Sequence, residues 1–179
     1  MSDQELLAAI HGYIDRYDRL RASTSTRASV LLSANAALTA GTIVLTNSRL
    51  SLAASLVAKI LLEALAALTM ALCVLSISLT INAIATWRTI RSIHGNEIPS
   101  RFLFNWGDTL RAVDGFSDFR QKVIPSRYGD LVEYGVAELW TSILQHRRRH
   151  KFLRYGIHAF RLAVACFSAL AALALFLVR

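Results

Sequence analysis

The chain has 179 residues, of which 54% are hydrophobic and only two are proline, and its formal net charge is +8. A mean hydropathy of +0.42 is too high for an ordinary soluble domain and is typical of a small helical membrane protein. Neither cysteine has the spacing of a metal site or a disulfide framework, and in a membrane protein the basic excess favours contact with anionic lipid over nucleic acid.

Residues 1–27 are predicted to form a cytosolic helix that stays on the mature protein, because they include acidic side chains and no apolar core of a signal peptide. Ser2 and Glu5 have the spacing of a capping box at its start. An apolar seam follows in steps of four and three residues, formed by Leu6, Ile10, Tyr13, Tyr17 and Leu20. This seam is expected to pack either on the rest of the same cytosolic domain or on a second subunit.

The first transmembrane span is predicted at residues 28–46, nineteen uncharged residues, which is close to the minimum for crossing ~30 Å of hydrocarbon. Alanine and glycine recur in this stretch and allow neighbouring helices to approach closely. Asn35 lies among them and requires a hydrogen-bond partner, so it either joins two helices or lines a pore.

Residues 50–87 contain no helix breaker but are too long for a single span. Lys59 and Glu63, four residues apart, are placed at the outer interface, which predicts a second span at 64–87 and an outer amphipathic segment at 50–62. Alternatively, the two charges pair within the bilayer and line an aqueous path. In both cases residues 28–87 form a transmembrane hairpin.

The third span is predicted at residues 156–179, with Arg161 close enough to its inner end to snorkel to the headgroups. Four of the 20 lysines and arginines lie in the N-terminal segment and 13 lie from Arg88 to Arg161. The positive-inside rule therefore places the N-terminus and the insert in the cytoplasm and the C-terminus in the periplasm. The predicted inner-interface anchors of the second span are Trp87, Arg88 and Arg91.

Residues 88–155 form a polar insert, which together with the N-terminal helix is predicted to make a small, mostly helical cytosolic domain. Aromatic residues alternate along residues 101–108 and predict an extended piece that ends at Gly107. Residues 116–123 are predicted to form a short helix with Ser117 as its N-cap. The fold class is thus an all-α membrane protein with three transmembrane helices.

A last helix is predicted from Asp130 into the third span, as one rod of roughly 70 Å. It carries a second seam, which we expect to dock on the N-terminal one, formed by Val132, Val136, Leu139 and Ile143. Residues 146–151 are a basic cluster that binds either anionic headgroups or nucleic acid. We favour the headgroups, and the predicted interface residues of this cluster are Arg147, Arg148, Arg149 and Lys151.

The sequence has no Gly-rich phosphate loop, no zinc-type spacing and no nucleophile elbow. Asp108, next to Gly107, is either a turn-capping residue or a general base. We expect a non-enzyme without cofactor or metal.

The order of these segments resembles the transmembrane effector family of Pycsar antiphage systems, over nearly the whole chain. The resemblance rests on TRASVLLSANAAL entering the first span, on Trp106, Gly107 and Asp108 within FLFNWGD, and on the helix from Asp130. It implies a bacterial inner-membrane homo-oligomer that senses cyclic CMP or cyclic UMP during phage infection and then impairs the membrane.

A cyclic mononucleotide presents one negative phosphate and a flat base, so its site needs a cation and an aromatic face. The insert supplies both, although the same aromatic residues also suit a protein core. The predicted ligand-binding residues are Arg101, Phe104, Trp106, Asp108, Arg111, Arg127 and Tyr128.

Ligand binding is expected to change how subunits pack through the two seams, and the last helix then carries this change into the spans. The small residues expected to make bundle contacts in the third span are Ala163, Ala165, Ala169, Ala171 and Ala172. The alternative function is a constitutive membrane scaffold or small ion channel without a nucleotide trigger.

Overall fold

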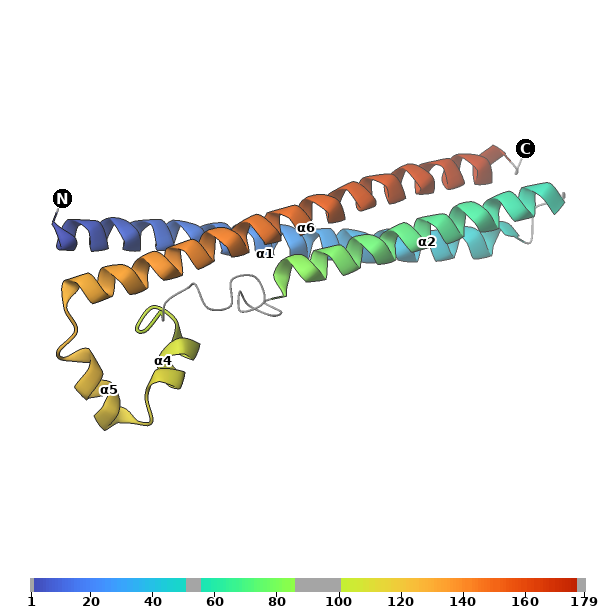
Figure 1. The fold of residues 1–179 in the computed structure, drawn as a ribbon. Helices are drawn as coiled ribbons and strands as arrows, with labels where there is room; N and C mark the ends of the chain where they lie inside the picture. Colours follow the sequence, from blue (N-terminus) through green and yellow to red (C-terminus); the bar gives the residue numbers. More distant parts are fainter. Residues whose placement is uncertain (1, 51–55, 86–100, 177–179) are drawn as a thin grey trace. The chain divides into compact units, whose positions relative to one another are not determined.

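The computed structural model describes residues 2–50, 56–85 and 101–176. These residues form α1 (Asp3–Leu50), α2 (Leu56–Ile84), α4 (Trp106–Ala112), α5 (Phe116–Val123) and α6 (Tyr128–Phe176), with no β-strand among them (Figure 1). The all-α prediction is confirmed. Three helices, α1, α2 and α6, are long and apolar enough to cross a membrane.

Helix α1 begins with the predicted capping box. The Ser2 N–H donates to Glu5 Oε2 at 2.8 Å, and the Glu5 N–H donates to Ser2 Oγ at 3.3 Å. The helix then continues to Leu50 without interruption, because neither proline of the chain lies in it. The predicted cytosolic helix and the predicted first span are therefore parts of one helix.

With the half-buried Ile14 and Tyr17 included, the buried face of α1 repeats in steps of three, four and seven residues, the spacing of a coiled-coil seam. The predicted seam is right at Ile10 but wrong at Tyr13 and Leu20, which are 54% and 36% exposed; Ile14 is half-buried in place of Tyr13. A face that continues through the aliphatic Ile14 leaves the tyrosine hydroxyl in water. The buried residues of α1 are Ile10, Thr24, Ala28, Leu31, Asn35 and Thr42.

The described residues fall into two compact units. Unit 1 consists of those within Met1–Ala22 and Thr86–Arg147, and unit 2 of those within Ser23–Ala85 and Arg148–Arg179. Both α1 and α6 contribute residues to each unit.

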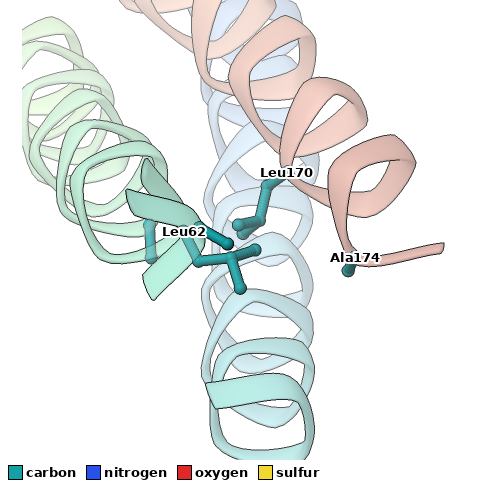
Figure 2. Packing of buried hydrophobic residues seen from close by; sticks show 5 residues of the cluster. Leu62, Leu170 and Ala174 are labelled. Carbon is teal, nitrogen blue, oxygen red and sulfur yellow. The ribbon is translucent and has the colours of Figure 1, made fainter. Parts of the chain in front are cut away.

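Unit 2 is a three-helix bundle with two buried clusters. In the first, Ala58, Leu62 and Ala66 of α2 pack with Leu170 and Ala174 of α6. Figure 2 shows the side chains of Leu62 and Leu170 pointing toward one another. The second cluster joins all three helices and contains Ala28, Leu31, Ala83 and Leu153.

The interior of unit 2 consists mainly of small side chains, while many large apolar side chains lie on its outside. The buried residues of α2, for example, are Ala58, Leu62, Ala66, Thr69, Cys73, Ser76, Thr80 and Ala83. Its exposed residues include Leu56, Val57, Ile60, Leu61, Leu68, Val74, Leu75 and Ile81. Bilayer-spanning bundles have this distribution, because small residues allow close helix contact and large ones face lipid.

Helix α2 differs from the prediction at its start. It begins at Leu56, so the described part of the predicted outer segment forms the first turns of the span helix. Lys59 and Glu63 are both exposed, whereas Leu62 between them is buried, so neither charge lines the interior of this bundle. Residues 51–55 and the predicted anchors Trp87, Arg88 and Arg91 lie outside the described residues.

The prediction of an extended piece at residues 101–108 is wrong. Residues 102–104 form a turn in which Leu103 has a φ of 71°, in the left-handed region. Asn105 then caps α4, since its Oδ1 accepts hydrogen bonds from the N–H groups of Gly107 and Asp108. The alternation of aromatic residues therefore reflects a turn followed by a helix start.

Helix α5 has the predicted bounds, but its N-cap is Gly115 and not Ser117, which lies inside the first turn. Helix α6 is confirmed as one rod of 49 residues, about 74 Å long at 1.5 Å per residue. Its predicted seam is wrong at Val136, which is exposed, because the helix packs through Gly135. A Cβ on Gly135 would lie 3.0 Å from Ile10 Cγ2, so α6 and the N-terminal part of α1 meet there within unit 1.

Candidate functional site

Three aromatic side chains join the turn at residues 101–105 to α5 and α6 in unit 1. The ring centroids of Phe102 and Phe119 are 6.1 Å apart, and those of Phe102 and Tyr134 are 6.2 Å apart with the rings nearly perpendicular. Phe102 is buried at the centre of the three. Each such ring pair stabilises by ~0.5–1.5 kcal/mol beyond its area burial, which fixes the turn against both helices.

An open cavity of about 300 Å³ lies beside these rings. This volume is at the lower end of the range for small-molecule sites, roughly 300–1,000 Å³. The wall combines two aromatic rings with one ammonium, one carboxylate and the hydroxyls of Ser126 and Tyr134, which suits a flat ligand with polar edges. The lining residues are Phe102, Ala112, Lys122, Pro125, Ser126, Asp130 and Tyr134.

Lys122 is the cation of this cavity, and its position is fixed by two acceptors. Its Nζ donates to the carbonyl oxygen of Ala112 and, at 2.8 Å, to Asp118 Oδ2. The hydrogen bond from Lys122, supported by the Asp114 N–H, holds the pKa of Asp118 below its ordinary value. An ammonium group has three donors, so Lys122 retains one for an anionic ligand group.

Arg101, next to Phe102, lies between two carboxylates. Its Nε donates to Asp108 Oδ2 at 2.8 Å and its Nη1 donates to Glu138 Oε2 at 3.0 Å. Only 8% of Arg101 is exposed. Burial raises the pKa of Glu138; the charge of Arg101 opposes the rise, and the charges of Asp108 and Asp18 add to it. Arg101 thus ties the turn and α4 to α6.

The structure brings together two of the seven predicted ligand-binding residues, Arg101 and Asp108, as an ion pair. Phe104 stacks on His11 with ring centroids 5.2 Å apart. Trp106 is 80% exposed. The remaining three are also exposed; they are Arg111, Arg127 and Tyr128. None of the seven predicted residues lines the cavity. Their role in ligand binding stays a prediction.

The sequence contains signals for the residues that prediction missed. Lys122 follows Asp118 by four residues on a predicted helix, the spacing of a helical ion pair. Tyr134 follows Asp130 by four residues and so lies on the same face of α6. Glu138 had no such signal, because its partner Arg101 is 37 residues away in sequence.

The basic cluster of α6 continues from unit 1 into unit 2. Arg147 is exposed, whereas Arg149 is buried. Arg148 lies over the ring of Phe152 at 5.7 Å, and Lys151 lies over the ring of Tyr155 at 6.0 Å. Basic side chains that lie over aromatic rings are suited to the level of the lipid headgroups. The predicted interface residue Arg161 is exposed on α6.

A chain of hydrogen bonds joins the three helices inside unit 2. Asn35 Nδ2 donates to Ser76 Oγ at 3.0 Å, and Ser76 Oγ donates to the carbonyl oxygen of Gly156 at 2.9 Å. Asn35 thus links helices, as in the first of its two predicted roles. A Cβ on Gly156 would lie 2.8 Å from Thr80 Oγ1, so α2 and α6 are in close contact at this level.

The predicted bundle contacts on α6 are only partly correct within one chain. Ala163 is buried and Ala171 is half-buried. Ala165, Ala169 and Ala172 are exposed, because they lie on the side of α6 away from the bundle core.

The geometry of unit 1 is suited to binding a small ligand, and that of unit 2 to spanning a bilayer. Comparisons of the chain with protein-family models, with curated proteins and with solved structures found no match.

Proposed function

We propose that the chain is an antiphage effector of a bacterial inner membrane. Cyclic CMP or cyclic UMP binds to unit 1, unit 2 then disrupts or permeabilises the membrane, and the infected cell stops growing or dies. The resemblance to Pycsar effectors supports this function. The observation that carries it is that α1 and α6 each run without a break through residues of both units, so a change in one unit has a direct mechanical route to the other.

The cavity in unit 1 is the proposed ligand site. A pyrimidine base lies against Phe102 and Tyr134, and the cyclic phosphate receives the remaining donor of Lys122. Ser126 Oγ, whose hydroxyl donates to the Lys122 carbonyl oxygen at 2.8 Å, supplies an acceptor at the same wall. In this assignment, the base contacts residues that line the cavity and not the exposed side chains of Trp106 and Tyr128.

Unit 2 is the proposed membrane part, with unit 1 on the cytoplasmic side. Its exposed leucine, valine and isoleucine side chains face lipid, and its polar hydrogen bonds lie inside the bundle. The excess of lysine and arginine in the N-terminal segment and the insert supports this orientation.

Coupling follows from the anchoring of the ligand site on α6. Tyr134 belongs to α6, and Arg101, adjacent to Phe102, is ion-paired with Glu138 of α6. A ligand can shift the packing of these helices only by the difference between its affinities for the two arrangements. The proposed coupling therefore requires that the tilt of α6 alters the width of the cavity, so that the ligand binds one helix arrangement more tightly than the other.

Calorimetric titration of the purified full chain with cyclic CMP and cyclic UMP tests the ligand site. The Lys122→Gln substitution should weaken binding by roughly 10- to 100-fold, as expected for loss of one hydrogen bond to a charged group. Arg120→Gln, an exposed neighbour on the same helix, is the matched control and should bind like the natural chain. Absence of binding by both nucleotides would rule out the sensing role.

The alternative, a constitutive scaffold or ion channel, is supported by the polar residues inside the bundle, such as Asn35 and Ser76. Expression alone distinguishes the two functions. A constitutive channel or scaffold acts in cells that lack the nucleotide, whereas the proposed effector is harmless until the nucleotide is supplied.

A further inference from the structure

Helix α6 has a second regular face in unit 2, opposite the face that packs in the bundle. Its bundle face contains the buried residues Gly156, Ala159, Ala163, Leu170 and Ala174. On the opposite side, six exposed residues recur in steps of four and three. They are Arg154, His158, Arg161, Ala165, Ser168 and Ala172, and we call them the outer face of α6.

Arg161 lies on α6 between the two buried clusters of unit 2, deeper than the interface position predicted from the sequence. Leu153 packs with Ala28, where the uncharged stretch of α1 begins, and Leu170 packs at the other end with Leu45. Arg161 is eight residues after Leu153 and nine before Leu170, which is about 12 Å and about 13 Å along the helix. The Cα of Arg161 is therefore about two helical turns from either cluster.

A cation at this depth needs water or a negative partner. The unfavourable free energy of an arginine at the centre of a bilayer is at least ~2.5 kcal/mol, and snorkelling relieves it mainly near helix ends. Among the described residues, no acidic side chain pairs with Arg161. Because Arg161 is exposed on the side away from the bundle, its hydration has to come from outside a single chain.

The rest of the outer face consists of small residues. Beyond Arg161 it continues with Ala165, Ser168 and Ala172, whose short side chains fill little space. The side of α2 opposite its buried face also exposes small residues, such as Ala67, Ala71 and Ser78, so the feature that distinguishes the outer face of α6 is its charge.

We propose that the outer face of α6 lines a water-filled path for small anions, formed between copies of this chain and bearing a ring of Arg161 side chains. This inference rests on the proposed membrane function and specifies the class of ion that passes. Identical arginines repel one another in a dry contact, so the copies surround water instead of packing tightly. A ring of arginine side chains attracts anions and excludes cations.

Substituted-cysteine labelling of the full chain in liposomes, with cyclic CMP and cyclic UMP added, tests the path. The two natural cysteines are first replaced by Cys73→Ala and Cys166→Ala. Single cysteines then go on the outer face, Ala165→Cys and Ser168→Cys, and at two control positions, Val164→Cys and Val74→Cys, both exposed but off that face. A sulfonated, membrane-impermeant methanethiosulfonate is the probe.

The outer-face thiols should react at least ~10-fold faster than the controls, because only a hydrated thiol ionises to the reactive thiolate. The anionic probe should also react faster than a trimethylammonium probe, and Arg161→Gln should remove this preference. Slow reaction at all four positions would overturn the path while leaving unit 2 in the bilayer. Fast reaction at all four would show that unit 2 is not embedded, which would contradict the membrane function itself.

Discussion

The interiors of the two units are built from different kinds of side chain. Unit 1 buries the aromatic ring of Phe102 and an arginine held between two carboxylates, Asp108 and Glu138. Unit 2 buries alanine, serine, threonine and one asparagine together with four leucines, Leu31, Leu62, Leu153 and Leu170, and exposes many of its other large aliphatic residues. The first arrangement neutralises a buried charge, whereas the second removes polar groups from contact with lipid.

This contrast indicates that the same two helices, α1 and α6, are stabilised by different forces along their lengths. In unit 1, an arginine is buried between two carboxylates, and an unpaired buried charge is strongly destabilising. In unit 2, close contact of small residues dominates and each interhelical hydrogen bond contributes little. Substitutions in the two units should therefore differ in both size and location of their effects.

The largest effect is expected for Arg101→Met in unit 1. Removing the guanidinium leaves Asp108 and Glu138 near each other without a cation, which should destabilise the unit by about 3 kcal/mol. Hydrogen–deuterium exchange should accelerate in α4 and in the part of α6 within unit 1. Arg111→Met, at an exposed arginine of α4, should change stability by less than ~0.5 kcal/mol. Equal acceleration in unit 2 would contradict the separation of the units.

Gly156→Ala should give the second largest effect, in unit 2. The added methyl group would lie 2.8 Å from Thr80 Oγ1, and this hydroxyl can retreat only by giving up its hydrogen bond to the Ser76 carbonyl. We expect a loss of about 2 kcal/mol, measured by thermal unfolding in detergent.

The matched control for that substitution is Gly12→Ala. No atom lies within 4 Å of a Cβ at Gly12, so the change should instead stabilise α1 by about 0.5–1 kcal/mol. The same sign for both glycines would be inconsistent with close contact of α2 and α6 at Gly156.

Asn35→Leu should have a smaller effect, a loss of about 0.6 kcal/mol, because interhelical hydrogen bonds in membrane bundles contribute about that much. Asn82→Leu is the control, since the Asn82 side chain is exposed and bonds only within its own helix. Thermal unfolding in detergent measures both. A loss as large as that of Gly156→Ala would mean that polar bonds, and not close packing, hold unit 2 together.

The smallest effect concerns pH and arises from Glu138. Its pKa is raised by burial, so the folded chain binds this proton more readily than the unfolded chain, and stability increases as pH falls through the raised pKa toward the ordinary glutamate value. Asp118 has the opposite effect on stability. Because its pKa is lowered, its stabilising contribution is lost only as the pH falls below the ordinary pKa of aspartate. Exchange of unit 1 amides between pH 7 and pH 5 should slow after correction for intrinsic rates, and Glu138→Gln should abolish this change.

Most of the fold could be predicted from local patterns. The capping box at Ser2 and Glu5, the bounds of α5 and the continuity of α6 all depend on residues close in sequence, and all are confirmed. The incorrect predictions concern which face of a helix is buried and where the chain turns. Tyr13 and Ile14 both lie one turn from Ile10, and only tertiary packing decides which is buried.

The candidate site was less predictable, because its residues come from separate elements. Phe102, Lys122 and Tyr134 meet only after the turn at residues 101–105 folds back, and Asn105 rather than any periodic pattern sets that turn. Glu138 carries no local signal of its role, since its partner Arg101 is 37 residues away in sequence. The aromatic and basic composition of the insert indicated a ligand site but not its members.

Release of an encapsulated dye from liposomes that contain the purified full chain tests the central claim most directly. Adding cyclic CMP or cyclic UMP should cause release from liposomes with the natural chain or Arg120→Gln, and much less with Lys122→Gln at the same nucleotide concentration. Without nucleotide, the dye should stay inside. Release that is independent of nucleotide, or retention of dye although nucleotide is bound, would contradict a sensor in unit 1 that acts on a membrane bundle in unit 2.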